Sequence, residues 1–197
     1  MVDPSVSVHP AALCDSDDIG PGTRIWAFAH VMAGARVGAD CNICGGSFVE
    51  RGVVVGDRVT IKNQVLLFEG VTIEDDAFIG PNVVFTNDPR PRTRSMQAEP
   101  WTATPTMVHR GASVGANATI RCGVRIGAHA LIGAGSVVLA DVPDHAIVAG
   151  NPARPIGWAC SCGARLDETL ACGCGRSYRL EAGTLSLRAD PGRRSGR

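Results

Sequence analysis

Four of the eight cysteines in this 197-residue chain form two matched pairs near its C-terminal end. Cys160 and Cys162 are followed by a glycine, and Cys172 and Cys174 repeat that arrangement. Four thiolates can close a tetrahedral zinc site and fold a segment too short to have its own core. The usual pair has two intervening residues and each pair here has one. Despite this shorter spacing, we expect a structural zinc ion whose four Cys ligands leave no open position for a substrate. Free thiols or disulfides are the alternatives, and a cytoplasmic setting disfavours disulfides.

The composition predicts a soluble globular protein with an unusual interior. Charged residues make up 19% of the chain, and no apolar run approaches the roughly 20 residues that a membrane span needs. The N-terminal residues lack the pattern of a signal peptide, so we expect a cytoplasmic protein that acts on neither membranes nor nucleic acids. Glycine is abundant, with 24 residues, whereas Phe, Trp and Tyr together number 9. The core should therefore consist of small aliphatic side chains.

Charge is unevenly divided along the chain. Residues 1–88 hold 5 basic and 12 acidic side chains, and residues 89–197 hold 14 and 7. The basic second half can attract phosphate groups. Because 18 of the 19 basic residues are Arg, the composition of the genome is an equally good explanation of the bias.

The elements that position any site follow a period of six. Large apolar residues recur at every sixth position from Leu13 to Phe85, with small or β-branched residues two positions before most of them. The period restarts from Val108 to Val138 in a new phase, so a loop at about 87–106 interrupts it. Four other cysteines fall within the repeats and are expected to be structural: Cys14, Cys41, Cys44 and Cys122.

A period of six suits short, flat strands separated by turns and fits neither a helix nor a long strand. Three hexapeptides form one triangular coil, and stacking pairs each strand with its equivalent in the next coil. The chain resembles the hexapeptide-repeat acyltransferases over about residues 13–156. That resemblance implies an all-β fold, a left-handed parallel β-helix with one protruding loop, and three copies that assemble with active sites between them.

Closer motifs narrow the resemblance. Residues 25–31 (IWAFAHV), 68–76 (FEGVTIEDD), 80–92 (GPNVVFTNDPRPR) and 148–154 (VAGNPAR) are similar to the nucleotide-sugar N-acetyltransferases. Those enzymes acetylate the 3-amino group of a UDP-linked amino-uronate or a dTDP-linked amino-deoxyhexose. The resemblance implies acetyl-CoA as cosubstrate. Members often carry a second His where this chain has Ala27, so any role of that ring is absent here.

Amide formation needs a neutral amine, a donor for the oxyanion and a thiolate that can leave. The resemblance implies positioning rather than a catalytic triad. We expect Asn87 to hold the sugar and a water beside the amine, Glu69 and Asp88 to bind sugar hydroxyls or take the proton, and His30 to act as a base or bind substrate. A turn-forming Asn and solvated carboxylates are the structural alternatives.

The remaining expected contacts involve charged and small residues. Lys62, the only Lys, should face outward toward a diphosphate, and Arg92 lies with Arg90 and Arg94 in a stiff basic loop. The resemblance places Asn151, Arg154 and Ala130 near the coenzyme, where the Arg154 guanidinium suits a phosphate. Solvated side chains are the alternative for Lys62, Arg92 and Arg154.

Three other functions remain open. A sugar O-acetyltransferase on the same fold should need an indispensable His. A metalloenzyme like the gamma-type carbonic anhydrases should gather three His residues, but His30, His109 and His129 stand at different phases of their hexads. A non-enzymatic scaffold fits the period alone.

The sequence predicts three segments. Residues 1–156 form the β-helix domain, residues 157–180 a Cys-rich, zinc-ribbon-like extension, and residues 181–197, rich in Gly, Arg and Ser, a loose tail.

Overall fold

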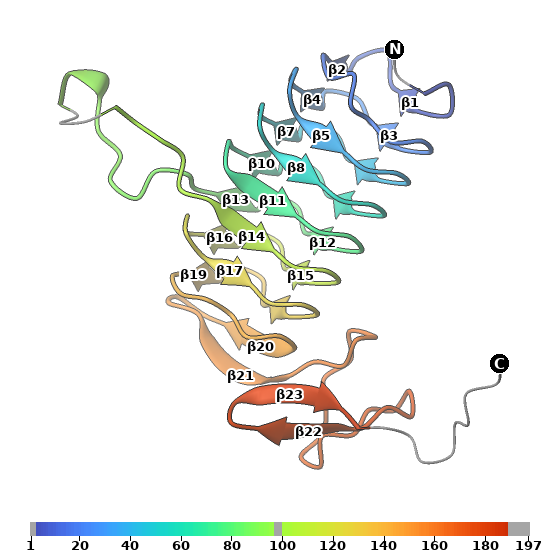
Figure 1. Cartoon of the computed structure of the whole chain (residues 1–197), viewed down its shortest axis with the longest axis vertical. Coiled ribbons are helices and arrows are strands. Elements are labelled where there is room, and N and C mark those ends of the chain that lie inside the picture. Colours follow the sequence, from blue (N-terminus) through green and yellow to red (C-terminus); the bar gives the residue numbers. More distant parts are fainter. Residues whose placement is uncertain (1–2, 97–99, 189–197) are drawn as a thin grey trace.

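The computed structural model describes residues 3–96 and 100–188, and it shows a three-sided β-solenoid (Figure 1). Its first face is a nine-stranded sheet of β1 (Ser7–Val8), β3 (Arg24–Ile25), β6 (Asn42–Ile43), β9 (Thr60–Ile61), β12 (Phe78–Ile79), β15 (Ser113–Val114), β18 (Leu131–Ile132), β20 (Ala146–Ala149) and β21 (Arg154–Trp158). The second face has seven strands: β2 (Leu13–Cys14), β4 (His30–Val31), β7 (Phe48–Val49), β10 (Leu66–Leu67), β13 (Val84–Phe85), β16 (Thr119–Ile120) and β19 (Val137–Val138). The third face has five: β5 (Arg36–Val37), β8 (Val54–Val55), β11 (Val71–Ile73), β14 (Thr106–Val108) and β17 (Arg125–Ile126).

The coil is left-handed. In Figure 1 the third-face strands lie in front and run from left to right, and the chain returns behind them as it descends from the N-terminus. This hand opposes the usual right-handed crossover between parallel strands. The prediction of a left-handed parallel β-helix is therefore confirmed.

The core is a stack of small aliphatic side chains, as the composition predicted. Ile25, Ile43, Ile61 and Ile79 pair in register down the first face and are at most 1% exposed. Phe85 is the only aromatic residue in the buried core of the solenoid within the described residues. Burial raises the pKa of the Cys41 and Cys44 thiols, which fits the structural role expected of them.

The first coil departs from the predicted period. Leu13 is 61% exposed, and Cys14 is the residue that pairs with the buried Val31. Val8 pairs with Ile25, which makes this coil shorter by one position than the regular coils, and the regular phase begins at Ile19, which pairs with Val37. The prediction that Leu13 starts the inward series was wrong because this coil lacks one position.

One coil carries the protruding loop, at the left of Figure 1. Ile73 pairs with Val55 on the preceding coil and with Val108 on the next one. The sequence separation across the loop is almost twice that of the regular coil. The insertion contains a single turn of 3-10 helix, η1 (Arg94–Met96), and its second end joins β14 at Thr106. This agrees with the loop expected at about 87–106.

The last coil is followed by a small extension. β21 runs antiparallel to β20, and two turns then lead to a hairpin of β22 (Tyr178–Glu181) and β23 (Thr184–Leu187). Residues 184–187 are therefore paired, not loose as expected from composition, because Leu185 packs into a second small core. The rest of the expected tail, residues 189–197, lies outside the described residues.

Candidate functional site

Three of the expected site residues gather at one corner of the solenoid. Leu66 pairs with Val84, so Glu69 and Asn87, each three positions further on, occupy the same corner in adjacent coils, and Asp88 follows directly. Strands in a sheet lie about 4.8 Å apart, which places these polar residues one above the other. Glu69 and Asn87 are separated by three hexapeptides, one full coil, so the period alone would have revealed their juxtaposition.

The loop begins at this corner and is fixed at its base. The Thr104 N–H donates to the Asn87 carbonyl at 3.0 Å, and the Thr106 N–H donates to the Gly70 carbonyl at 3.0 Å. Gly70 has a φ of +95°, and a Cβ there would lie 3.1 Å from the Ala103 Cβ. A glycine is thus required where the loop packs back on the corner.

The acidic residues of the corner have local partners. The Glu69 N–H donates to Glu50 Oε2 at 2.7 Å, and the Glu69 carboxylate lies 3.8 Å from Arg51 Nε. Asp88 Oδ1 accepts the Arg90 N–H at 2.8 Å. No hydrogen bond within the described part of the chain engages the side-chain amide of Asn87, so that amide is available to a ligand.

His30 lies on the same face but not at the same height. It is on β4, separated from β13 by β7 and β10, so about 14 Å of sheet lies between it and the level of Asn87. Its Nε2 lies 2.9 Å from Asp15 Oδ2, and its ring meets Phe48 edge-on at 5.6 Å. Within one protomer, His30 and Asn87 do not form one site.

Lys62 occupies a different corner, between the first and second faces. Beside it in sequence, Asn63 and Gln64 line a hollow of about 600 Å³ with Trp26 and Phe28. Phe28 is 78% exposed, and the Trp26 indole N–H donates to Asn42 Oδ1 at 2.6 Å. Sequence analysis did not anticipate this aromatic-rimmed hollow.

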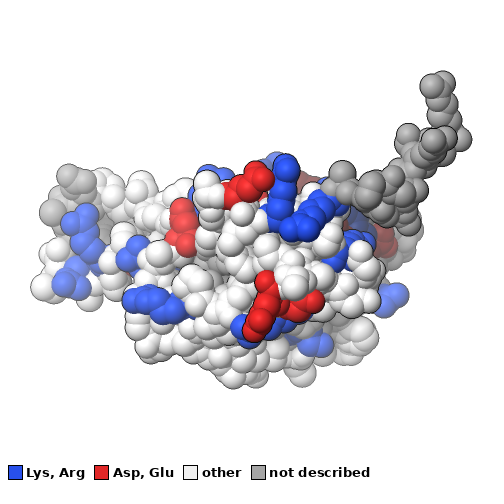
Figure 2. All heavy atoms as spheres, turned by 90° about the horizontal axis from the view of Figure 1, so that it is seen from below, with Lys and Arg blue, Asp and Glu red and all other residues white. Residues whose placement is uncertain are grey.

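Arg92 lies on the exposed, protruding loop. Its Nη1 donates to the Pro91 carbonyl at 2.8 Å. On the face of the molecule in Figure 2, basic and acidic side chains are interspersed, and no continuous patch of one charge covers that face.

The three expected coenzyme contacts lie at the C-terminal end, with unequal access. Asn151 is exposed in the turn after β20 and is joined to Pro152 by a cis peptide bond. Arg154 is exposed at the start of β21 and borders a hollow of about 180 Å³. Ala130, however, is 1% exposed, its N–H donates to Gly127 and its carbonyl accepts from Ser113. Ala130 thus packs in the solenoid wall, and its expected contact with the coenzyme stays a prediction.

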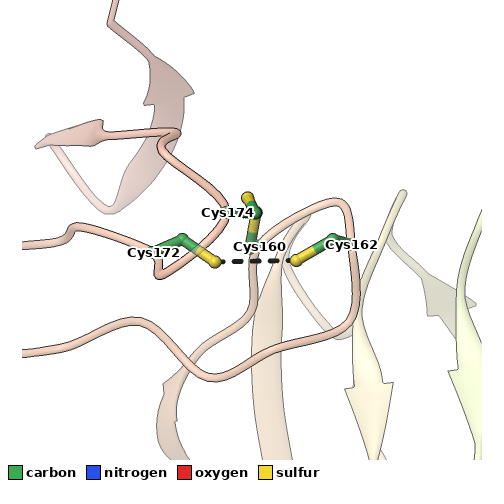
Figure 3. Close-up of side chains that lie close together, drawn as sticks. All are labelled: Cys160, Cys162, Cys172 and Cys174. Carbon is green, nitrogen blue, oxygen red and sulfur yellow. Dashed lines mark hydrogen bonds between the residues drawn. The ribbon is translucent and has the colours of Figure 1, made fainter.

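The four C-terminal cysteines converge, as Figure 3 shows. Their sulfur atoms all lie within 4.8 Å of one another. Burial disfavours the Cys160 thiolate, but hydrogen bonds from the Tyr178 hydroxyl and the Cys162 N–H outweigh it and lower the pKa of Cys160 to about 6. The Cys174 N–H favours the Cys172 thiolate, yet the neighbouring thiols raise the pKa of Cys172 to about 12. Tyr178, the only Tyr in the chain, was missed by sequence analysis.

The histidines do not form a metal site in the described ranges. His109 Nδ1 lies 3.2 Å from Glu74, and His129 stacks on His145 at 5.0 Å, but the cysteines are the only cluster of three or more candidate ligands among the described residues. In those same ranges, no helix has the length and hydropathy that crossing a membrane would require.

Comparison with known proteins agrees with the fold and defines the class. The family of bacterial transferase hexapeptide repeats matches residues 18–51 and 105–140. The dTDP-3-amino-3,6-dideoxy-alpha-D-galactopyranose 3-N-acetyltransferase of Aneurinibacillus thermoaerophilus is 46% identical over 182 residues, which cover 91% of this chain and 93% of that enzyme. This chain belongs to the hexapeptide-repeat acetyltransferases and is an acetyltransferase.

More distant matches share a smaller region or the fold alone. Serine acetyltransferase 4 of Arabidopsis thaliana is 37% identical over 107 residues, covering 54% of this chain and 24% of that enzyme. An X-ray structure from Bacillus cereus matches with a TM-score of 0.53 and 21% identity, covering 77% of this chain and 76% of that one.

Proposed function

We propose that the protein transfers the acetyl group of acetyl-CoA to the 3-amino group of a dTDP-linked amino-deoxyhexose. The observation that carries this proposal is the 46% identity to the Aneurinibacillus thermoaerophilus enzyme, which extends along 91% of the chain. The corner of Glu69, Asn87 and Asp88, with its exposed loop, offers polar groups that suit a sugar.

The corner residues bind and orient the amine. The Asn87 amide holds the sugar so that the lone pair of its amine faces the thioester carbonyl, and Glu69 and Asp88 accept hydrogen bonds from sugar hydroxyls. The amine attacks the carbonyl carbon, the C–S bond breaks, and the departing thiolate takes the proton that the nitrogen loses. A backbone N–H stabilises the oxyanion between these steps. Correct positioning therefore supplies most of the rate.

The coenzyme is held at the C-terminal end. Arg154 offers a fork of N–H donors to a phosphate of coenzyme A, and the exposed Asn151 turn contacts the pantetheine arm. The hollow of about 180 Å³ beside Arg154 gives this end a concave surface.

The active form is a homotrimer. Asn87 and Lys62 stand at different corners of one solenoid, so a single protomer does not bring them to the same sugar nucleotide. A neighbouring copy supplies the corner that carries Lys62. In this arrangement Lys62 and Arg92 are directed at the diphosphate. Light scattering should give the mass of three chains, and a monomer that retains full turnover would contradict this assembly.

The reaction is tested by incubating the full chain with acetyl-CoA and a dTDP-3-amino-3,6-dideoxyhexose, while thiol release is followed by absorbance and the product by mass spectrometry. Release that requires the amine supports the proposal. The matching sugar with a hydroxyl at C3 tests O-acetylation, and the UDP-linked 3-amino-uronate tests the other nucleotide. No release with either amino sugar would sink the proposed reaction.

A further inference from the structure

The Cys-rich extension is built from two copies of one turn. One constant shift along the sequence superimposes Cys160 on Cys172, Cys162 on Cys174 and Leu166 on Tyr178. In each copy the first Cys donates its N–H to the carbonyl four positions on, at 2.8 Å, and its own carbonyl accepts from the glycine after the second Cys. Each turn is closed by an isolated antiparallel bridge, Ala159 to Arg165 and Ala171 to Ser177. Such duplicated turns present their sulfurs toward a shared centre.

The distances between the sulfurs fit a metal and not a disulfide. Cys160 Sγ lies 3.6 Å from Cys174 Sγ, and Cys162 Sγ lies 3.6 Å from Cys172 Sγ. A disulfide requires about 2.05 Å. Four sulfurs at about 2.3 Å from a central zinc ion form a tetrahedron with edges of about 3.8 Å. Both close pairs join one turn to the other, as the dashed line in Figure 3 shows for Cys162 and Cys172.

Outer groups support the sulfurs. The Tyr178 hydroxyl lies 3.2 Å from Cys160 Sγ and accepts the Ser161 N–H at 3.0 Å. Arg176 Nη1 donates to Cys174 Sγ at 3.3 Å. Four thiolates around a divalent cation carry a net charge of −2, which such donors stabilise.

The extension needs a staple because its core is small. Among the described residues it has five buried members, which are Cys160, Cys172, Leu166, Tyr178 and Leu185, with the partly buried Trp158 and Leu170 packed against them. A core of this size does not stabilise a fold unaided.

We propose that Cys160, Cys162, Cys172 and Cys174 bind one structural zinc ion per chain, which fastens the extension to the last strand of the solenoid. Cys160 follows β21 after one residue, and the Ala159 N–H donates to the His145 carbonyl at 2.7 Å. The zinc site therefore holds the end of the strand that begins at Arg154. Resting on the proposed function, a second consequence is that metal loss weakens coenzyme A binding.

The test begins with metal analysis of the full chain purified without chelators. We expect one zinc per chain in the wild type and in C14A, which removes a thiol outside the cluster, and none in the double variant C162S/C174S, whose substituted side chains are exposed. Cobalt substitution should give the absorption of a tetrahedral thiolate site. Four free thiols in metal-free, folded wild type would overturn the proposal, as would iron in place of zinc.

The second consequence has its own readout. Calorimetric titration with coenzyme A should show at least tenfold weaker binding to C162S/C174S than to wild type, and unchanged binding to C14A. Equal affinities would overturn the link to β21 even if zinc is present. If wild-type protein contains zinc but binds no coenzyme A, the proposed function fails while the metal site stands, so the two failures are distinguishable.

Discussion

His30 Nε2 lies 2.9 Å from Asp15 Oδ2, in an arrangement that would suit a general base. The pair is nevertheless on the upper coils, three strands of the second face away from Asn87. With 32% and 57% of the two side chains exposed, this contact can stabilise the surface of the first coils without taking part in proton transfer.

The substitution H30A should therefore lower kcat less than tenfold. In the proposed reaction the amine is held at Asn87, beyond the reach of this imidazole in the same protomer, and the leaving thiolate takes the proton. Steady-state thiol release with the 3-amino sugar nucleotide measures kcat, and D15A should also lower kcat less than tenfold. A loss of about 100-fold or more, as expected for removal of a general base, would favour O-acetyl chemistry or a His30 supplied by a neighbouring subunit.

Replacing the amide at the loop corner should have the opposite outcome. We expect N87A to lower kcat by about 100-fold, since loss of alignment of the reacting atoms costs this much, with little change in the KM for acetyl-CoA. The E168Q variant, which alters an exposed residue of the extension, is the control. If N87A keeps wild-type kcat, Asn87 is only a turn residue.

Lys62 is predicted to bind the diphosphate through its charge. Removing one charge-assisted hydrogen bond in K62A should raise the KM for the sugar nucleotide roughly tenfold, whereas K62R should restore most of the loss. The KM for acetyl-CoA serves as the internal control. Identical KM values in wild type and K62A would leave Lys62 as a surface residue.

The stacked aliphatic side chains should dominate stability. Ile61 is fully buried between Ile43 and Ile79, so I61A should cost about 3 kcal/mol in free energy of unfolding through lost contacts and a cavity. Chemical denaturation of the protein at fixed concentration measures this, with the exposed R36A as control. A cost below that of R36A would contradict the buried ladder.

The sequence predicted the solenoid well because each coil repeats one packing requirement. It failed at Leu13, because Leu13 and Cys14 both suit the core and only the pairing with Val31 decides between them. The corner of Glu69 and Asn87 was encoded in their separation by one full coil. The strand at 184–187 was not, since its order depends on the contact of Leu185 with Tyr178 and the cysteines in a small core that no local sequence pattern predicts.

Ala130 illustrates a different limit. Resemblance places it near the coenzyme, but a small residue at its phase of the hexad is also what the solenoid wall needs, and its methyl group is buried. For such a residue, the requirements of packing and of coenzyme binding select the same small side chain, so the sequence does not separate them.

The stacked pair His129 and His145 predicts a pH dependence of stability. Burial, followed by the charge of His145, lowers the pKa of His129 below 6.5. At neutral pH the ring is largely uncharged in both the folded and the unfolded chain, so it does not affect the free energy of unfolding. Below pH 6.5 the unfolded chain binds the proton more readily than the folded chain. The free energy of unfolding therefore falls with pH until the pKa of the folded state is passed. Thermal unfolding from about pH 7.5 to about pH 5.5 should therefore show a decline in Tm that is smaller in H129Q. The exposed H9Q is the control, and equal slopes in H129Q and wild type would show that the stacked ring is not the group responsible.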